Sequence, residues 1–158
     1  MPSGPMSSPA VGGRAMKLLP GLGLAILRIA LGVIFLMHGY LGFDIGPEGI
    51  AGYTTRMGYP LSMGHALGWY LIAAHSIGGI LLIVGFLTRW AALAQLPIMA
   101  SAFFLHHLRQ GFFLTGIVVD AARGVAIAGG YEYTLLVLAA TVTLVLAGGG
   151  WPAVDRAR

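Results

Sequence analysis

Five polar side chains in this apolar sequence could do binding or acid–base chemistry: Arg28, His38, His75, His107 and Glu132. Arg28 interrupts the apolar run LAILRIALG. A guanidinium near the centre of a bilayer costs at least about 2.5 kcal/mol, so Arg28 should face the protein interior and have a partner there. Imidazole and carboxyl groups can titrate near working pH and pass protons along a polar path. These residue types therefore indicate a polar, ligand-binding interior.

Helical periodicity predicts which of these residues share a face. Steps of four and three residues from Leu24 pass through Arg28 and His38, and the same steps from His65 pass through His75. Arg28 precedes His38 by ten residues and His75 follows His65 by ten, which is about 15 Å of helix in each case. We therefore expect Arg28 and His75 to meet near mid-membrane. An outward-facing mouth should be ringed by His38, His65, His106, His107 and Glu132.

Each residue also has a structural interpretation. Arg28 could bond helix carbonyls and Glu132, and His75 could be a satisfied core histidine. Glu132 could simply complement the N-terminus of the last helix. A set of His38, His107 and Glu132 would resemble a two-histidine, one-carboxylate metal site, but no single helix supplies a tight ligand motif. His75 has no histidine partner at its depth for a haem. We assign no metal site, and the sequence has no haem or flavin motif strong enough to assign.

Composition restricts the class of protein. The chain has 158 residues, of which 58% are hydrophobic and 9% charged, whereas soluble domains carry about a quarter charged residues. The chain has no cysteine, so it forms no disulfide and no thiolate metal site. The net charge of +4 is spread thinly, which indicates orientation in a membrane and no binding of nucleic acid. These values predict a small integral membrane protein in a lipid bilayer.

Four apolar segments are long enough to cross a bilayer as helices: 18–37, 65–87, 90–108 and 131–147. We predict an all-α membrane protein, an antiparallel bundle of four transmembrane helices over residues 18–148. A flexible N-terminal tail (1–17) and a C-terminal tail (149–158) flank this domain. Because only Thr88 and Arg89 separate the second and third segments, these two helices must be antiparallel neighbours.

An even number of spans places both termini on the same side of the membrane. Basic residues favour that side by five to three, with Arg14, Lys17, Arg89, Arg156 and Arg158 against Arg56, Arg109 and Arg123. This bias predicts cytoplasmic termini. The longer loops, 38–64 and 109–130, then face outward and could fold back as partial helices or as a lid.

Four segments carry a family resemblance: LRIALGVIFLMHG (27–39), GGILLIVGFLTRWAAL (78–93), HLRQGFF (107–113) and GGYEYTLLVL (129–138). Together they resemble the DoxX family of small four-helix bacterial membrane proteins, with a weaker match at the Gly-rich end with Asp155. The resemblance implies a multi-pass protein of the bacterial cytoplasmic (inner) membrane. It also implies association with quinone-linked oxidoreductases. By position, the polar residues of the family pattern correspond to Arg28, His38, Arg89, His107 and Glu132.

One position departs from the family pattern. Family members commonly have Glu in E-x-x-G-G, and this chain has His75 there, in AHSIGG. The acid that could neutralise Arg28 at mid-depth is therefore absent from the sequence.

Two functions remain open. In the first, the chain is the quinone-binding membrane subunit of an oxidoreductase, and not a self-contained enzyme. Arg28 and His75 hydrogen-bond a quinone oxygen, and a partner subunit supplies electrons. His38, His107 and Glu132 relay protons. In the second, the chain is a non-catalytic accessory subunit of a larger respiratory or photosynthetic membrane complex. A carrier or channel is disfavoured, because four helices without an inverted repeat are unlike transporter folds.

Overall fold

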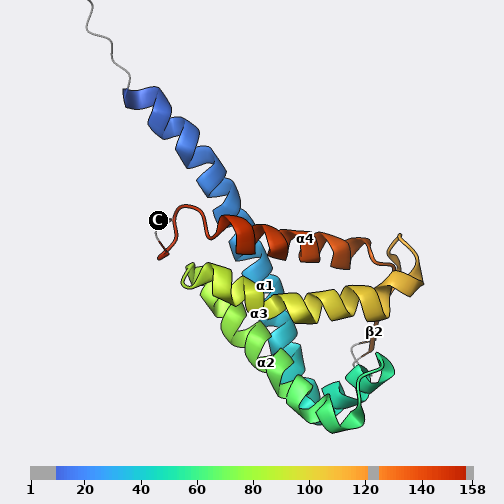
Figure 1. Cartoon of the computed structure of the whole chain (residues 1–158). Coiled ribbons are helices and arrows are strands. Elements are labelled where there is room, and N and C mark those ends of the chain that lie inside the picture. Colours follow the sequence, from blue (N-terminus) through green and yellow to red (C-terminus); the bar gives the residue numbers. More distant parts are fainter. Residues whose placement is uncertain (1–9, 121–124, 156–158) are drawn as a thin grey trace, which may run out of the picture.

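The computed structural model describes residues 10–120 and 125–155 (Figure 1). In this part of the chain the elements are α1 (Ala10–Arg56), α2 (Leu61–Val84), α3 (Thr88–Ser101), strands β1 (Thr115–Asp120) and β2 (Val125–Gly129), and α4 (Glu132–Ala147). A π-helical segment (Ala102–His106) and a 3-10 turn (His107–Gln110) extend α3. The predicted helical architecture is confirmed. The segment between α3 and α4, whose structure the sequence left open, forms an antiparallel hairpin in which Val118 pairs with Ile127.

Three helices can cross a membrane by length and composition: α1 from Leu19, α2, and α3 with its extension to Gln110. α4 is apolar but has only 16 residues, fewer than the roughly 20 that span a bilayer. Large apolar side chains cover the outside, including Ile26 at 70% and Leu146 at 71% of full exposure. Such a surface suits lipid and would be a liability in water. The protein is therefore a helical membrane protein.

Helix α1 is longer than the sequence predicted. It has 47 residues, about 70 Å of helix, which is more than twice the hydrocarbon thickness of about 30 Å. It runs through residues 10–17, predicted as tail, and through residues 38–56, predicted as loop. The remainder of the predicted tail, residues 1–9, lies outside the described residues. Gly46 interrupts the helix with φ 75° and ψ 162°, and Pro47 follows it, so the helix bends at this point.

Helices α1 and α2 pack as a close antiparallel pair. A Cβ on Gly79 would lie 2.8 Å from the backbone nitrogen of Leu36, and one on Gly32 would lie 2.8 Å from the carbonyl oxygen of Gly79. Only glycine permits this approach of two backbones. Further along, Gly39 packs directly against Ser76. These glycine contacts fix how far α1 is shifted along α2.

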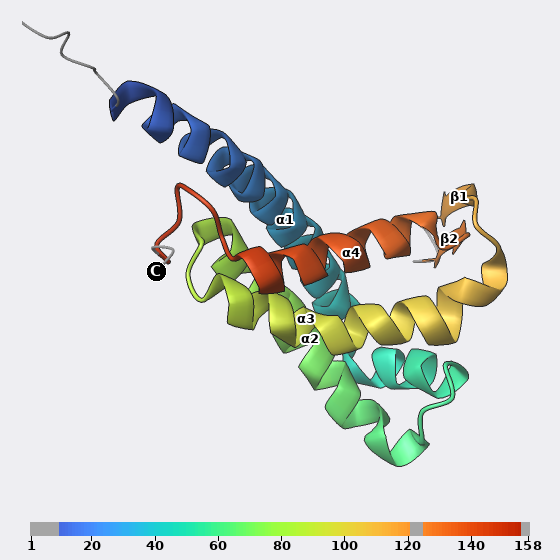
Figure 2. The same cartoon turned by 45° about the horizontal axis from the view of Figure 1, so that its top comes forward.

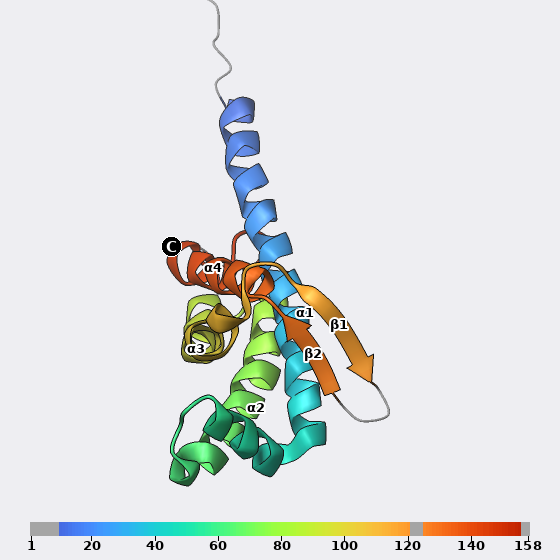
Figure 3. The same ribbon diagram turned by 90° about the vertical axis from the view of Figure 1, so that its right-hand side faces the viewer.

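Helices α3 and α4 form a second antiparallel pair. The two pairs cross steeply, so that α3 and α4 are seen nearly end-on where α1 and α2 are upright (Figure 3) and extend to one side in the other views (Figures 1 and 2). The sequence predicts one antiparallel bundle of four helices, whereas the structure has two antiparallel pairs that cross each other. The core at the crossing combines residues of all four helices: Leu31, Phe35, Leu82, Ala91, Ala92, Met99, Val137, Ala140 and Leu144.

Candidate functional site

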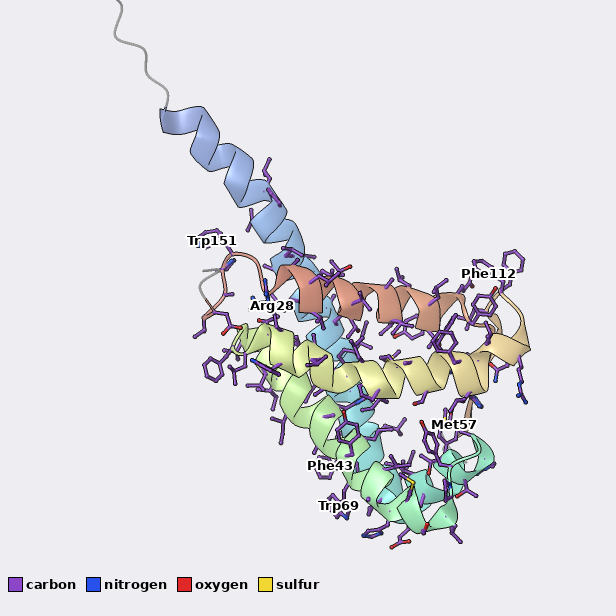
Figure 4. All side chains as sticks on the ribbon, in the orientation of Figure 1. Arg28, Phe43, Met57, Trp69, Phe112 and Trp151 are labelled. Atoms are coloured by element: carbon purple, nitrogen blue, oxygen red, sulfur yellow. The ribbon has the colours of Figure 1, made fainter. Side chains whose placement is uncertain are left out.

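Arg28 is buried at the end of the α1–α2 pair that lies near the C-terminus. Its side chain is 2% exposed, and its Nη2 donates to the carbonyl oxygen of Pro152 at 2.7 Å. Nη1 lies so close to Gly85 that a Cβ at this glycine would collide with it. Within the described residues, Nε and Nη1 have no hydrogen-bond partner. Figure 4 shows Arg28 between α1 and the chain that leads to the C-terminus.

Asp155 holds the same end of the molecule together. Its carboxylate accepts hydrogen bonds from the backbone N–H of Leu87 at 2.8 Å and of Thr88 at 2.5 Å, and so caps the start of α3. Its own N–H donates to the carbonyl of Gly85 at 2.8 Å. Burial alone would raise the pKa of Asp155, but the hydrogen bonds from Thr88 and Leu87 and the charge of Arg28 bring that pKa below its ordinary value.

Residues 150–155 therefore form a C-terminal clasp over α1 and the α2–α3 turn. Trp151 adds a backbone hydrogen bond, from its N–H to the carbonyl of Gly21 at 3.1 Å. Residues 150–155 of the predicted C-terminal tail are thus bound to the helices, and residues 156–158 lie outside the described residues. Sequence reasoning missed Pro152 and Asp155 as partners of Arg28. The available signal was Asp155, which already belonged to the resemblance.

His75 is buried between α1 and α2, away from Arg28. It is 4% exposed, and its ring makes edge contacts with Phe35 (centroids 5.2 Å apart) and His38 (6.0 Å). Its Nδ1 has no hydrogen-bond partner among the described residues. His38 is exposed, and its Nδ1 donates to the carbonyl of Ile34 at 2.8 Å. An exposed and a buried imidazole thus lie side by side.

The prediction that Arg28 and His75 meet is wrong. Arg28 contacts Gly85, which follows His75 by ten residues, or about 15 Å of helix. The prediction placed His38 and His65 at one depth. Because Gly39 packs on Ser76, His38 instead lies beside His75.

The other polar residues predicted at the site are dispersed. His65 pairs with Glu48 (Nδ1 to Oε1, 3.1 Å) near the start of α2, about 15 Å of helix before His75. Nδ1 of His107 contacts Oε1 of Gln110 at 3.1 Å, and the ring of His106 lies 4.7 Å from that of His107. His38, which lies beside His75, therefore does not join His65 in the predicted ring around one mouth.

Glu132 also lies apart from Arg28. Its Oε1 accepts the backbone N–H of Leu114 at 2.8 Å, and so holds the chain ahead of the hairpin against the start of α4. Glu132 therefore does not neutralise Arg28, as one predicted alternative had it. Arg28 instead bonds to Pro152 and lies near the charge of Asp155. In residues 10–120 and 125–155, no three histidine or acidic side chains come together as metal ligands would.

Comparisons with known proteins place the chain in a family. The DoxX family model matches residues 23–108, a span that contains Arg28, His38, His75 and His107. A protein of Bacillus subtilis (strain 168) named "Putative oxidoreductase CatD" is 30% identical over 135 residues, which cover 85% of this chain and 85% of that protein. No solved structure matches the chain. The order of the apolar helices, the buried Arg28 and these two matches agree: the chain belongs to the DoxX family.

Proposed function

We propose that this protein is the quinone-binding membrane subunit of an oxidoreductase, with the ligand contact at His75. Support comes from the family, from the name of the Bacillus subtilis relative, and above all from one observation. The Nδ1 atom of His75 is buried without a hydrogen-bond partner within the described residues. An unpaired buried polar atom costs about 1–3 kcal/mol, and a bound ligand is one explanation for it. The hydroxyl of the neighbouring Ser76 is likewise buried without a partner among the described residues.

The residues around His75 fit a quinone carbonyl. A neutral imidazole can donate one hydrogen bond from a ring nitrogen, and a carbonyl oxygen accepts it. Arg28 does not fit this role, because its guanidinium is enclosed by Gly85 and the C-terminal clasp. When bound, a quinone takes up two electrons and two protons to give the quinol. A partner redox protein would supply the electrons.

His38 is suited to deliver protons to His75. Because Nδ1 of His38 donates to the carbonyl of Ile34, that nitrogen carries the proton and Nε2 is left to accept another. His38 is exposed and in edge contact with His75, so the two imidazoles connect the surface with the interior. Arg28, His107 and Glu132 bond within the fold, and we assign ligand contact and proton delivery to His75 and His38 alone.

The test is the quinone content of the purified protein and of matched histidine variants. After extraction in mild detergent, mass spectrometry should find quinone with the wild type and a loss of about tenfold with His75→Phe, since about 1.4 kcal/mol of binding free energy is one factor of ten. His38→Phe should keep the quinone and slow its reduction by the complex. His65→Phe is the control, because His65 lies on an exposed turn. Wild-type protein without quinone, or equal retention by His75→Phe, would contradict the proposal.

A second candidate is a non-catalytic accessory subunit of a respiratory or photosynthetic membrane complex. The C-terminal clasp favours it, because the one buried guanidinium in the described part of the chain has an architectural role. In this case Arg28→Leu lowers the yield of assembled complex and leaves turnover per complex unchanged, and neither histidine variant affects turnover.

We further propose that α4 crosses the bacterial inner membrane with the other three helices, and that both termini are cytoplasmic. The chain has no cysteine, so single cysteines can be introduced without background. A membrane-impermeant maleimide added to intact cells should label Ser62→Cys and Gln110→Cys, but label Phe86→Cys only after lysis. The reverse pattern would place the termini outside, and labelling of Ser62→Cys without Gln110→Cys would exclude this arrangement of spans.

A further inference from the structure

A cavity of about 110 Å³ lies far from Arg28, between the part of α1 that follows the kink, the first half of α2 and the end of α3. Its wall includes Tyr53, Met57, Tyr59, Tyr70 and Leu71. We propose that this cavity binds the ring of an uncharged monocyclic aromatic or quinoid molecule. The inference rests on the proposed function and deepens it, because it names where the ring of the quinone lies.

The volume of the cavity restricts the ligand. An engineered protein cavity of about 150 Å³ holds a benzene molecule, and the cavity here, at about 110 Å³, is of comparable size. Because it is the smaller of the two, it has room for a single six-membered ring at most, and any substituents would extend out of it. A haem or a fused flavin ring system does not fit.

The chemistry of the wall excludes charged ligands. None of the residues that line the cavity carries a charge. Several hydroxyl groups of the wall already bond to backbone carbonyls: Tyr70 to Ala94 at 2.6 Å, and Ser101 to Ile98 at 2.9 Å. An ion would lose its water here without gaining a partner. Aromatic rings instead favour stacked or edge contacts with another ring.

Two tyrosines supply such contacts on the α1 side. The ring of Tyr53 is held edge-on by His106, with centroids 5.2 Å apart. Tyr59 lies after the turn at Gly58, whose φ of 97° brings the chain back toward α2. Tyr53 is held at the end of α1 by His106, and Tyr59 is held by the turn at Gly58. This side of the cavity is therefore formed before a ligand binds.

The backbone around the cavity is irregular on each side. α1 bends at Gly46, and α3 passes into the π-helical segment Ala102–His106, whose first residue lines the cavity. π-helical turns inside α-helices are often found at functional sites. Figures 1 and 3 show the bent end of α1 beneath the far half of α3, and Figure 4 labels Met57 on this turn. The cavity thus lies where both helices depart from a straight path.

The cavity and His75 lie one turn apart along α2. Leu71 lines the cavity, and His75 follows it by four residues, which places the two on the same face of the helix one turn apart. A ring bound between Tyr53 and Leu71 would therefore have its inner edge toward the turn that carries His75. His75 itself does not line the cavity, so a ring bound there would lie one helical turn from the histidine pair.

The experiment is photolabelling of the full-length protein in lipid nanodiscs with an azido-benzoquinone that carries a decyl tail, mapped by mass spectrometry. We expect labels in residues 53–59 and 97–102, which decylubiquinone and toluene each suppress. Ala102→Phe places a ring in the cavity and should reduce labelling about tenfold, or about 1.4 kcal/mol. Ala73→Phe, on the exposed side of α2, is the control and should label like the wild type. Met57→Trp is a second filling variant in case Ala102→Phe does not fold.

The outcomes separate this inference from the proposed function. If quinone co-purifies but the label maps elsewhere and is insensitive to both filling variants, the cavity inference is overturned and the proposed function survives. If no quinone co-purifies and the label still maps to the cavity, with toluene as competitor, the ring site stands and the proposed function fails. If a photoreactive phospholipid acyl chain labels the same wall and toluene does not compete, the cavity holds a lipid tail and the inference is wrong.

Discussion

Arg28 and Pro152 are 124 positions apart in the sequence, yet Nη2 of the first donates to the carbonyl oxygen of the second at 2.7 Å. This contact joins the helix that the sequence identifies as the first span to a segment that the sequence predicts as a tail. It means that Arg28 is bound within the fold, near the negative charge of Asp155, at the end of the helix pair and away from His75.

Removal of the Arg28 side chain should destabilise the protein. Arg28→Ala deletes the bond to Pro152 and leaves a void beside Gly85, and hydrogen bonds of charged groups contribute about 1.5–3 kcal/mol. We expect a clear fall in Tm in detergent. Arg109→Ala, at an exposed position, is the matched control and should leave Tm unchanged. Equal Tm values for Arg28→Ala and the wild type would show that the clasp contributes no stability.

Asp155 should give stability a specific dependence on pH. Its folded-state pKa is below its ordinary value, so the carboxylate stabilises the fold above the unfolded-state pKa of about 3.9. This contribution is lost as the pH falls through the folded-state pKa. Asp155→Asn should therefore lower Tm at neutral pH, and the difference from the wild type should close in acid. Measurements of Tm from neutral pH downward test this, with Asp44→Asn, an exposed carboxylate, as the control. A gap that stays constant with pH would contradict it.

Gly85 should tolerate no side chain. It has φ 76°, and a Cβ there would collide with Nη1 of Arg28. The backbone strain alone costs about 1–3 kcal/mol, and displacement of the guanidinium adds to it. Gly52→Ala is the comparison, because a Cβ at Gly52 meets nothing within 4 Å and helical alanine is favoured by about 0.5–1 kcal/mol. We expect Gly85→Ala to lower Tm and Gly52→Ala to hold or raise it. The same response from both variants would argue against the close contact.

Glu132 should protect one backbone amide rather than the whole fold. Its Oε1 accepts the N–H of Leu114, so Glu132→Ala should speed hydrogen exchange at Leu114 while the amides of α2 keep their protection. Glu132→Gln retains an acceptor oxygen and should have an intermediate effect. Unchanged exchange at Leu114 would mean that this bond is not formed in solution.

The sequence was sufficient for the helices and for one of their contacts. Runs of apolar residues define the helical segments, and the short separation after the second segment makes the second and third helices neighbours. In the structure this turn lies at residues 85–87, Thr88 and Arg89 already belong to α3, and α2 and α3 cross steeply instead of lying antiparallel (Figure 3). Periodicity also placed Arg28 and His75 in the interior, where the structure has them at 2% and 4% exposure. These features are local, so a single chain segment determines each of them.

The relative depth of the polar residues could not be predicted in the same way. Periodicity fixes which face a residue occupies, but not how far one helix is shifted along another. That shift depends on backbone contact at Gly32 and Gly79, and it separates Arg28 from His75 and brings His38 beside His75. The tyrosine-lined cavity depends on the bend at Gly46 and on the π-helical segment, neither of which has a periodic signal.

The C-terminal clasp has a consequence for synthesis on the ribosome. Arg28 enters the membrane early, whereas Pro152 and Asp155 are made after all four helices, so Arg28 lacks its bond to Pro152 until the clasp has been translated. A chain truncated before Pro152 lacks the hydrogen bond from Arg28 to Pro152. It also lacks the carboxylate of Asp155 that caps the start of α3. Chains without the clasp should therefore hold the first helix and the start of α3 less firmly than chains that carry it.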